Sequence, residues 1–354
     1  MLDEFPPKKL LALAKTCETP FLAIDLKRLK ANEDCFSGAA KSFFPKAQVC
    51  YSVKTNPNPS VFNSLSTGFE IASLEELKLV KSRKVFKVFN GCCKKESELK
   101  EALRQKALVI VDSFSELEKL IELEKSPKLK RLEIGVRLNV ASKFGIELSR
   151  IPAFISKAGH SGLEVVLLHA HPGVHNSLKD YSEFMKGFRK AAELHDFKYL
   201  DLGSGFPSFP KMKSLNVSLG DYFGVARKEL GALADEKTII FEPGRVLVAD
   251  AGFLVCKVCA IKELNGEKIA VLDAGINVLQ KIVLEDFEFE LLQPRAGKKE
   301  NFRLAGPLLF GNDFVGSLNA SLKEGDLIAV KNTGAYCLSL AWEVSYKKPE
   351  IFVF

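Results

Sequence analysis

One lysine follows a short apolar segment in a position that suits covalent chemistry. Lys54 comes directly after Val49-Cys50-Tyr51-Ser52-Val53 and precedes Thr55-Asn56-Pro57. Burial at the end of a strand lowers the pKa of a lysine, and the neutral amine condenses with an aldehyde to give a Schiff base. Most lysines in such a position are solvated loop residues, so the rest of the chain must decide between the two interpretations.

Further residues carry chemistry that would fit such an amine. Gly203-Ser204-Gly205 lets backbone amides approach an oxyanion closely, and Arg245 offers a fork of donors, so the two suit a phosphate group. Glu242 can hold a proton on a ring nitrogen, and His171 can lie flat against a planar ring. The simpler interpretations are an ordinary glycine turn and a core histidine.

The eight cysteines show no disulfide framework, which predicts reduced thiols in a chain of this size. Cys256-Lys257-Val258-Cys259 has the spacing of half a zinc site. No second pair accompanies it, and residues three apart in a strand point to opposite faces. We therefore expect no metal and interpret these cysteines as small hydrophobic residues.

The composition is that of a globular protein. Of 354 residues, 47% are hydrophobic and 27% are charged, enough for one large domain or two medium ones. The net charge of +7 is spread along helical segments, so we expect no nucleic-acid partner. No apolar run approaches the roughly 18 residues of a membrane span. Residues 1–15 lack the features of a signal peptide, so we expect a cytoplasmic protein without membrane contact.

The elements that must position these groups alternate regularly. Apolar runs of strand length recur near residues 48–53, 69–73, 86–90, 107–112, 132–139, 164–171, 199–204 and 238–243. Amphipathic helical segments lie between them, as at 73–85, 95–105, 113–124 and 180–194. Because these strands are apolar on both faces and eight in number, we predict an α/β fold, a closed (β/α)8 barrel of the TIM type, over residues 26–250.

The chain changes character after residue 250. Short strands at 253–261, 268–272, 326–330 and 351–354 are joined by turns with little helical periodicity. The apolar run at 21–24 falls outside the eight-fold count. We therefore predict a second, all-β domain built from residues 251–354 together with residues 1–25.

In a barrel of this type the reacting groups lie at the carboxyl ends of the strands. The predicted strand ends are polar along most of the chain. They carry Lys54, Glu70, Ser73, Asn90, Arg137, Asn139, His169, His171, Ser204 and Glu242. We expect these side chains to converge on one mouth and to form a site there.

Short motifs occur in a specific order along nearly the whole chain. They are Thr19-Pro20, Tyr51-Ser52-Val53-Lys54, Phe69-Glu70-Ile71-Ala72-Ser73, Val111-Asp112-Ser113, Ser142-Lys143-Phe144-Gly145-Ile146, His169-Ala170-His171, Leu200-Asp201-Leu202-Gly203-Ser204-Gly205-Phe206-Pro207, Glu242-Pro243-Gly244-Arg245, Asp273-Ala274-Gly275, Gly306-Pro307 and Gly334-Ala335-Tyr336. By these motifs the chain resembles the alanine-racemase-like, fold-type III pyridoxal-phosphate enzymes. Within them it resembles the diaminopimelate, ornithine and arginine decarboxylase group.

The resemblance implies pyridoxal 5'-phosphate as the cofactor. Lys54 would form the internal aldimine, Glu242 would keep the pyridine nitrogen protonated, and His171 would stack on the ring. The other cofactor-binding residues that the resemblance implies are Glu70, Arg137, Gly203, Ser204, Gly205, Gly244, Arg245 and Tyr336. Relatives are homodimers with shared active sites, so we expect a homodimer in which the Gly306-Pro307 loop crosses to the partner.

The chain departs from this group on the substrate side of the site. Relatives read Gly-Pro-x-Cys followed by an acid, whereas this chain reads Gly306-Pro307-Leu308-Leu309-Phe310. Leu309 and Phe310 thus replace the proton-donating cysteine and a substrate-binding acid. Lys281 takes the place of the substrate arginine of the diaminopimelate enzymes, and Asp286 takes that of the acid used by polyamine-forming relatives.

The predicted function is decarboxylation of an amino acid or an amino-acid-derived small molecule. In place of the missing cysteine, the proton could come from water, Lys54, His175 or Cys337. The candidates for binding the distal end of the substrate are Lys281, Asp286 and the segment 293–303. Two alternatives stay open, an amino-acid racemase of the same fold and a noncatalytic homologue that only binds the cofactor.

Overall fold

The structure is a computed structural model that describes residues 5–124, 132–140, 142–174, 177–280 and 285–354. The chain divides into two compact units. The barrel unit comprises Asp34–Pro207 and Met212–Gly244. The β unit comprises Met1–Glu33, Ser208–Lys211 and Arg245–Phe354.

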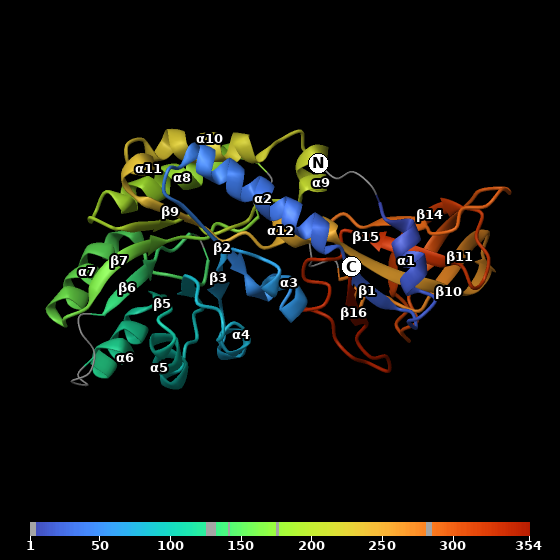
Figure 1. Cartoon of the computed structure of the whole chain (residues 1–354), viewed down its shortest axis with the longest axis horizontal. Coiled ribbons are helices and arrows are strands. Elements are labelled where there is room, and N and C mark those ends of the chain that lie inside the picture. The colour runs from blue at the N-terminus through green and yellow to red at the C-terminus, as the bar shows by residue number, and fades with distance from the viewer. Residues whose placement is uncertain (1–4, 125–131, 141, 175–176, 281–284) are drawn as a thin grey trace. The chain divides into compact units, whose positions relative to one another are not determined.

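Parallel strands form a closed barrel in the barrel unit (Figure 1). They are β2 (Ala47–Ser52), β3 (Gly68–Ile71), β4 (Lys87–Phe89), β5 (Leu108–Val111), β6 (Glu133–Arg137), β7 (Glu164–His169), β8 (Tyr199–Asp201) and β9 (Thr238–Phe241). β2 pairs with β3 on one side and with β9 on the other, where Val49 lies opposite Phe241. The predicted eight-stranded barrel is confirmed.

Helices alternate with these strands and surround them (Figure 1). They are α2 (Leu26–Phe43), α3 (Pro59–Asn63), α4 (Leu74–Leu79), α5 (Glu96–Arg104), α6 (Phe114–Glu124), α7 (Ile151–His160), α8 (Leu178–Ala192), α9 (Phe209–Ser214), α10 (Leu219–Leu230) and α11 (Leu233–Glu236). A further short helix, α12 (Arg245–Val248), belongs to the β unit. Ser73, Ser177 and Ser218 start α4, α8 and α10 because each hydroxyl accepts a hydrogen bond from an amide of the first turn. α4 ends at Leu79, earlier than predicted, and the Arg83 amide beyond it closes a turn on the Val80 carbonyl at 3.0 Å.

Aromatic side chains fill the space between α2, α10 and the barrel strands. The Phe36 ring packs edge-on against Phe206 and Phe223, each at 5.4 Å between centroids. Phe223 in turn lies 5.0 Å from Phe241, the last residue of β9. Tilted and edge-to-face contacts of this kind stabilise the core beyond the area they bury. The cluster therefore fixes the end of β9, which is directly followed by Glu242.

The β unit contains one eight-stranded sheet. Its strands are β1 (Phe21–Ile24), β10 (Gly252–Leu264), β11 (Glu267–Leu272), β12 (Glu288–Leu291), β13 (Glu300–Ala305), β14 (Phe314–Ala320), β15 (Leu327–Lys331) and β16 (Glu350–Val353), and α1 (Pro7–Leu13) precedes them. Phe21 lies opposite Val255 of β10 in an antiparallel pair and opposite Glu350 of β16 in a parallel pair. The N-terminal strand thus joins the sheet of the C-terminal part, as predicted.

Three strands of this sheet were not predicted. β12, β13 and β14 carry glutamate, asparagine, arginine and glycine between their apolar residues, so no apolar run of strand length marks them. In β10 the expected alternation holds, because Cys256 is buried and Cys259 is exposed.

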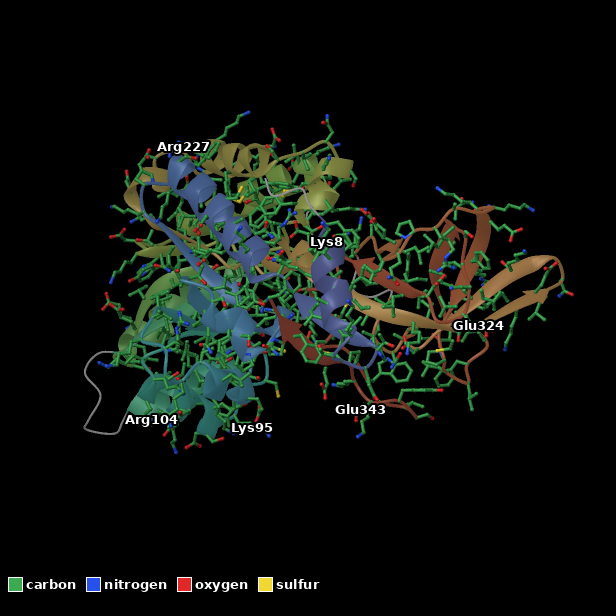
Figure 2. All side chains as sticks on the ribbon, turned by 45° about the vertical axis from the view of Figure 1, so that its right-hand side comes forward. Lys8, Lys95, Arg104, Arg227, Glu324 and Glu343 are labelled. Atoms are coloured by element: carbon green, nitrogen blue, oxygen red, sulfur yellow. The ribbon has the colours of Figure 1, made fainter. Side chains whose placement is uncertain are left out.

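Charged side chains are distributed over the surfaces of both units, as Lys95, Arg104, Arg227 and Glu324 illustrate (Figure 2). This distribution agrees with the predicted solvated faces rather than with one basic patch. In the described part of the chain, every helix is too short or too polar to cross a lipid bilayer.

Candidate active site

Lys54 lies in a single 3-10 turn, Val53–Thr55, that directly follows β2. Its ammonium nitrogen donates to Glu70 Oε2 at 2.7 Å. The Lys54 side chain is 41% exposed, whereas that of Glu70 is 1% exposed. Lys54 is therefore only partly buried, so desolvation alone does not fix its amine at the strand end. A buried carboxylate holds the amine there instead.

Glu70, the third residue of β3, collects hydrogen bonds from three different side chains. Its Oε2 accepts from the Ser52 hydroxyl at 2.6 Å as well as from Lys54, and its Oε1 accepts from Asn90 Nδ2 at 3.3 Å. A buried carboxylate is stable only when donors replace its lost water. The three donors thus fix Glu70, and Glu70 fixes the Lys54 amine.

Glu242 directly follows β9 and is 2% exposed. Its Oε1 accepts a hydrogen bond from Asn90 Nδ2 at 2.8 Å, and its Oε2 lies 3.4 Å from His169 Nε2. The structure therefore brings Lys54, Glu70 and Glu242 together through one amide, that of Asn90.

Two histidines extend from the end of β7, and burial favours the neutral form of both. Burial, and then the charge of Arg137, lower the pKa of His169 well below its usual 6.5. Burial, and then the charge of Lys54, lower the pKa of His171 to about 4. His171 Nδ1 accepts a hydrogen bond from the Gly173 amide at 3.1 Å, which an unprotonated Nδ1 allows. A neutral imidazole is suited to lie against a planar ring.

The glycine turn after β8 offers backbone amides. Gly203 and Gly205 have φ values of +62° and +114°, a region that favours glycine. A Cβ on Gly203 would lie 2.7 Å from the Ala170 carbonyl oxygen. The Gly203 amide donates to Asp201 Oδ1 at 2.9 Å. The amides of Ser204 and Gly205 make no hydrogen bond within the described ranges, so they are available to an anion.

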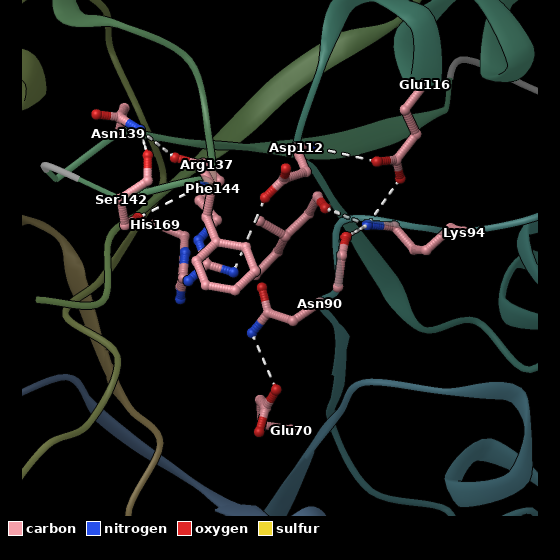
Figure 3. A network of polar contacts seen from close by, with 12 residues as sticks. Glu70, Asn90, Lys94, Asp112, Glu116, Arg137, Asn139, Ser142, Phe144 and His169 are labelled. Atoms are coloured by element: carbon pink, nitrogen blue, oxygen red, sulfur yellow. Dashed lines mark hydrogen bonds and ion pairs between the residues drawn. The ribbon is translucent and has the colours of Figure 1, made fainter. Parts of the chain in front are cut away.

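Arg137, at the end of β6, is held from two sides (Figure 3). Its Nη1 lies 3.9 Å from Asp112 Oδ1, and its guanidinium stacks 4.4 Å from the Phe144 ring centroid. Its side chain is 12% exposed. Asn139 donates to the Ser142 carbonyl at 2.8 Å and so fixes the loop that carries Phe144. The predicted pocket residue is thus in a fixed position at the strand ends.

A buried ion pair supports this side of the barrel (Figure 3). Lys94 Nζ lies 2.8 Å from Glu116 Oε1 and donates to the Ile110 carbonyl at 2.9 Å. Glu116 Oε2 accepts from the Asp112 amide at 3.1 Å. Burial lowers the pKa of Lys94 and raises that of Glu116, so desolvation opposes both charges. The pair connects β5 and α6 to the carboxylate that faces Arg137.

Arg245 and Tyr336 belong to the β unit. The Arg245 guanidinium lies 5.2 Å from the Tyr336 ring centroid, and its Nη1 lies 3.2 Å from Glu285 Oε2. Glu285 also accepts from the Ser208 hydroxyl at 2.6 Å, and burial raises its pKa. The two predicted phosphate-binding side chains are thus adjacent, with an acid beside them that the sequence did not indicate.

The residues predicted for the substrate are less closely grouped. Asp286 pairs with Lys211 at 2.6 Å and its side chain is 67% exposed. Leu309 is 98% exposed and Phe310 is 46% exposed. The Phe310 ring lies 6.0 Å from that of Trp342. The predictions for Lys281 and His175 fall outside the described residues.

The loop that carries Leu309 and Phe310 is held at its base by Asp313. This buried carboxylate accepts hydrogen bonds from the amides of Ile276 and Leu308, each at 2.8 Å. The Gly306 amide donates to the Asp313 carbonyl at 2.8 Å. The base of the loop is therefore fixed, while its tip is exposed.

Three polar residues of this region had no predicted role. Asn90 and His169 were expected at the mouth because they stand at strand ends, but no chemical role was predicted for either. Asp201 ends β8 and is fully buried. The hydrogen bonds of Asn90 to Glu70 and Glu242 depend on how neighbouring strands are aligned, which the sequence alone does not specify.

The barrel-unit groups suit a planar ring that carries an aldehyde, a nitrogen and a phosphate. The amine of Lys54 matches the aldehyde, and the buried Glu242 carboxylate matches a ring nitrogen. The neutral His171 matches the ring face, and the amides of Ser204 and Gly205 match the phosphate. This combination fits pyridoxal phosphate.

Comparisons with known proteins agree with this chemistry. A sequence profile described as "Pyridoxal-dependent decarboxylase, pyridoxal binding domain" matches residues 35–249. Diaminopimelate decarboxylase of Vibrio cholerae is 30% identical over 340 residues, covering 83% of this chain and 77% of the relative. Diaminopimelate decarboxylase of Aquifex aeolicus is 28% identical over 366 residues, covering 93% of this chain and 84% of the relative.

Solved structures are also similar. Diaminopimelate decarboxylase from Helicobacter pylori, complexed with L-lysine, superposes with a TM-score of 0.87 at 25% identity, covering 98% of this chain and 94% of that one. The fold is also that of the lysine/ornithine decarboxylase from Vibrio vulnificus, with a TM-score of 0.86 at 22% identity. These relatives are decarboxylases, which favours that activity over a racemase or a noncatalytic homologue. The chain therefore belongs to the pyridoxal-dependent amino-acid decarboxylases, and its cofactor is pyridoxal 5'-phosphate.

Proposed function

We propose that Lys54 is the residue to which the cofactor aldehyde binds, and that the barrel mouth is the decarboxylation site. The observation that carries this proposal is the Lys54 amine held 2.7 Å from a buried Glu70, with Asn90 linking Glu70 to Glu242. When bound, the cofactor supplies an electron-poor ring that accepts the electron pair left at Cα as carbon dioxide departs. The roles below belong to the protein.

Each side chain has one task in this proposal. Glu242 keeps the ring nitrogen protonated, since its carboxylate is buried and anchored by Asn90. His171 packs on the ring face as a neutral imidazole. The amides of Ser204 and Gly205 bind the phosphate, together with the guanidinium of Arg245. Glu70, Arg137, Gly203, Gly244 and Tyr336 complete the cofactor site.

We propose that Lys54 also returns the proton, moving it from Nζ to Cα of the substrate. Its amine is at the mouth and partly exposed, so it reaches a bound substrate. Cys337, the other described candidate, is fully buried, and burial raises the pKa of its thiol far above the usual value. A residue without access to the mouth is a poor proton donor there.

The proposed substrate is an amino acid with a distal part larger and less basic than that of diaminopimelate. Leu309 and Phe310 are apolar where relatives carry a cysteine and an acid. Asp286, the other acid in question, is already paired with Lys211. A distal ammonium group would therefore find no free acid among these residues, whereas an apolar or conjugated side chain would find apolar contacts.

We further propose a cytoplasmic homodimer in which the β unit completes the site of its partner. Exposed apolar side chains of the β unit support an interface, namely Leu309, Phe310, Leu340, Val344 and Tyr346. The cysteines are all free, which suits a reducing compartment.

The test is cofactor binding followed by turnover. Wild-type protein reconstituted with pyridoxal phosphate should be yellow and should release carbon dioxide from one member of a panel. The panel contains diaminopimelate, lysine, ornithine, arginine and larger conjugated amino acids. Lys54→Ala should lose the bound colour, whereas Lys100→Ala on exposed α5 should keep it. Wild type that binds no cofactor, or Lys54→Ala that retains the colour, contradicts the assignment.

A further inference from the structure

Asp201 places a second buried acid against Glu242. It is the last residue of β8 and is completely inaccessible to solvent. A ring nitrogen of His169 and a carboxylate oxygen each of Asp201 and Glu242 lie within 4.8 Å of one another, and all three residues are buried. The family-derived predictions assign no role to Asp201, and the mechanism proposed above does not use it.

Two carboxylates so close together in a buried site do not both carry a charge. Their repulsion is strong at low dielectric, and no water screens it. His169 is a poor source of compensating positive charge, because burial and then the charge of Arg137 lower its pKa well below the usual 6.5. One proton must therefore reside on the carboxyl pair.

The hydrogen bonds show which carboxyl group holds that proton. Glu242 Oε1 accepts from Asn90 at 2.8 Å, so Glu242 has a donor suited to its charged form. Asp201 Oδ1 accepts from the Gly203 amide, but Asp201 Oδ2 has no hydrogen-bond partner among the described residues. A buried oxygen without a partner is costly, and a proton on Oδ2 removes that cost by making it a donor.

We infer that Asp201 is a neutral carboxylic acid that donates a hydrogen bond to the Glu242 carboxylate. It thereby acts as a positioning residue that connects Glu242 to the glycine turn. This inference rests on the proposed role of Glu242 at the ring nitrogen. The direction of the Asp201 pKa agrees, since burial and then the charge of Glu242 raise it well above the usual 3.8. The other titratable groups that face Asp201 are Cys50, Glu70 and His169.

The same acid connects two parts of the cofactor site. Asp201 Oδ1 fixes Gly203, whose carbonyl in turn accepts the Glu242 amide at 2.8 Å. The orientation of the Gly203–Gly205 turn and that of the Glu242 carboxylate therefore depend on one side chain. Loss of Asp201 should weaken phosphate and ring-nitrogen contacts together.

Two substitutions separate a neutral acid from a charged one. In Asp201→Asn, Oδ1 still accepts from Gly203, and Nδ2 still donates to Glu242 with no titratable proton. We measure the dissociation constant for pyridoxal phosphate by absorbance titration of each apoprotein. The constant of Asp201→Asn should stay within about threefold of the wild-type value, whereas Asp201→Ala should bind the cofactor about ten- to hundredfold more weakly. Equal weakening in both variants means that a carboxylate charge is required, and this overturns the inference.

Infrared spectroscopy of the apoprotein provides a second readout that does not depend on cofactor or turnover. Wild type at neutral pH should show the carbonyl stretch of a protonated carboxyl group, shifted in heavy water and absent from Asp201→Asn. Its absence from wild type overturns the inference, even if Asp201→Ala fails to fold. Wild type that shows the band yet binds no cofactor contradicts the proposed function of the site instead, so the two failures are distinguishable.

Discussion

The side-chain amide nitrogen of Asn90 lies 2.8 Å from Glu242 Oε1. The same nitrogen lies 3.3 Å from Glu70 Oε1. Asn90 follows β4 directly and is 5% exposed, so both bonds are made away from solvent. One neutral residue thus connects the acid that holds Lys54 to the acid proposed for the ring nitrogen.

Replacing this amide by a carboxylate should disrupt both acids. Asn90→Asp places a third acid between two buried ones, which favours protonation of one of them. We expect the dissociation constant for pyridoxal phosphate to rise at least about tenfold. Asn265→Asp makes the same change in the exposed turn between β10 and β11 and should leave the constant unchanged. Unchanged binding by Asn90→Asp would show that the bridge is dispensable.

The neutral state of His171 predicts how stability depends on pH. Its pKa is about 4 in the folded chain and 6.5 when unperturbed, so the unfolded state binds more protons between these values. The His171 contribution to the free energy of unfolding is therefore fully present above pH 6.5 and decreases as the pH falls to about 4. His171→Phe keeps a flat ring and should remove this part of the pH dependence, measured by urea unfolding.

A control histidine distinguishes this effect from general acid sensitivity. His160→Phe, at the exposed end of α7, should retain the wild-type pH dependence. If the His171 and His160 variants have the same profile, His171 is not the group responsible.

The buried Lys94 and Glu116 pair should be costly to break and nearly neutral to replace. Lys94→Met should lower the free energy of unfolding by about 3–5 kcal/mol, because it leaves a buried Glu116 unpaired. The double variant Lys94→Met/Glu116→Leu should recover most of this loss in urea titrations. Lys100→Met, which breaks an exposed pair on α5, should have a much smaller effect. A double variant whose free energy of unfolding is no higher than that of Lys94→Met would exclude this coupling.

The exposed loop tip should set substrate preference. Leu309→Cys/Phe310→Glu restores the residue types found in relatives, and both positions are exposed, so folding should be unaffected. We expect kcat/KM for diaminopimelate to rise relative to that for larger amino acids, by about tenfold. Leu264→Cys, also an exposed leucine, is the control. An unchanged ratio would place substrate selection elsewhere.

The proposed homodimer with shared sites makes a prediction about mixed subunits. Lys54→Ala should be inactive when pure, and Phe310→Asp should lose activity with the wild-type substrate, whose proposed distal part needs apolar contacts. An equal mixture, unfolded and refolded together, should regain about a quarter of wild-type activity, because half of the dimers contain one site with neither substitution. Size-exclusion chromatography with light scattering checks that dimers form. Dimers that regain no activity would place Lys54 and Phe310 of one site in the same chain.

The regular part of the fold could be predicted from sequence because its physical cause is local. Buried parallel strands are apolar throughout, so each barrel strand appears in the sequence as an apolar run. The run Phe21–Ile24 is a ninth and was therefore assigned to the other domain. β12, β13 and β14 were missed because each has polar residues on its solvated face. α4 was predicted to continue to residue 85 but ends at Leu79, and Arg83 beyond it donates to the carbonyl of Leu65, a contact that no local pattern indicates.

The strand ends that carry polar side chains could be predicted from the sequence, but the hydrogen bonds between those side chains could not. A polar strand end indicates that a side chain reaches the mouth, and Lys54, His171 and Glu242 were chosen on that basis. The bonds of Asn90 to Glu70 and Glu242 depend on how separate strands are placed around the ring. For the same reason the exposure of Lys54 and the contact of Arg245 with Glu285 required the structure.

The Asp313 anchor has a consequence for how this chain can change over evolution. A Cβ on Gly306 would lie 2.3 Å from Asp313 Oδ2, so the base of the loop tolerates little variation. Leu309, three residues later, is 98% exposed and contributes almost nothing to that base. Mutations at the tip are therefore nearly free of a folding penalty, and selection can act on them for chemistry alone. Such a division would let the substrate contacts of the tip change while the base of the loop stays the same.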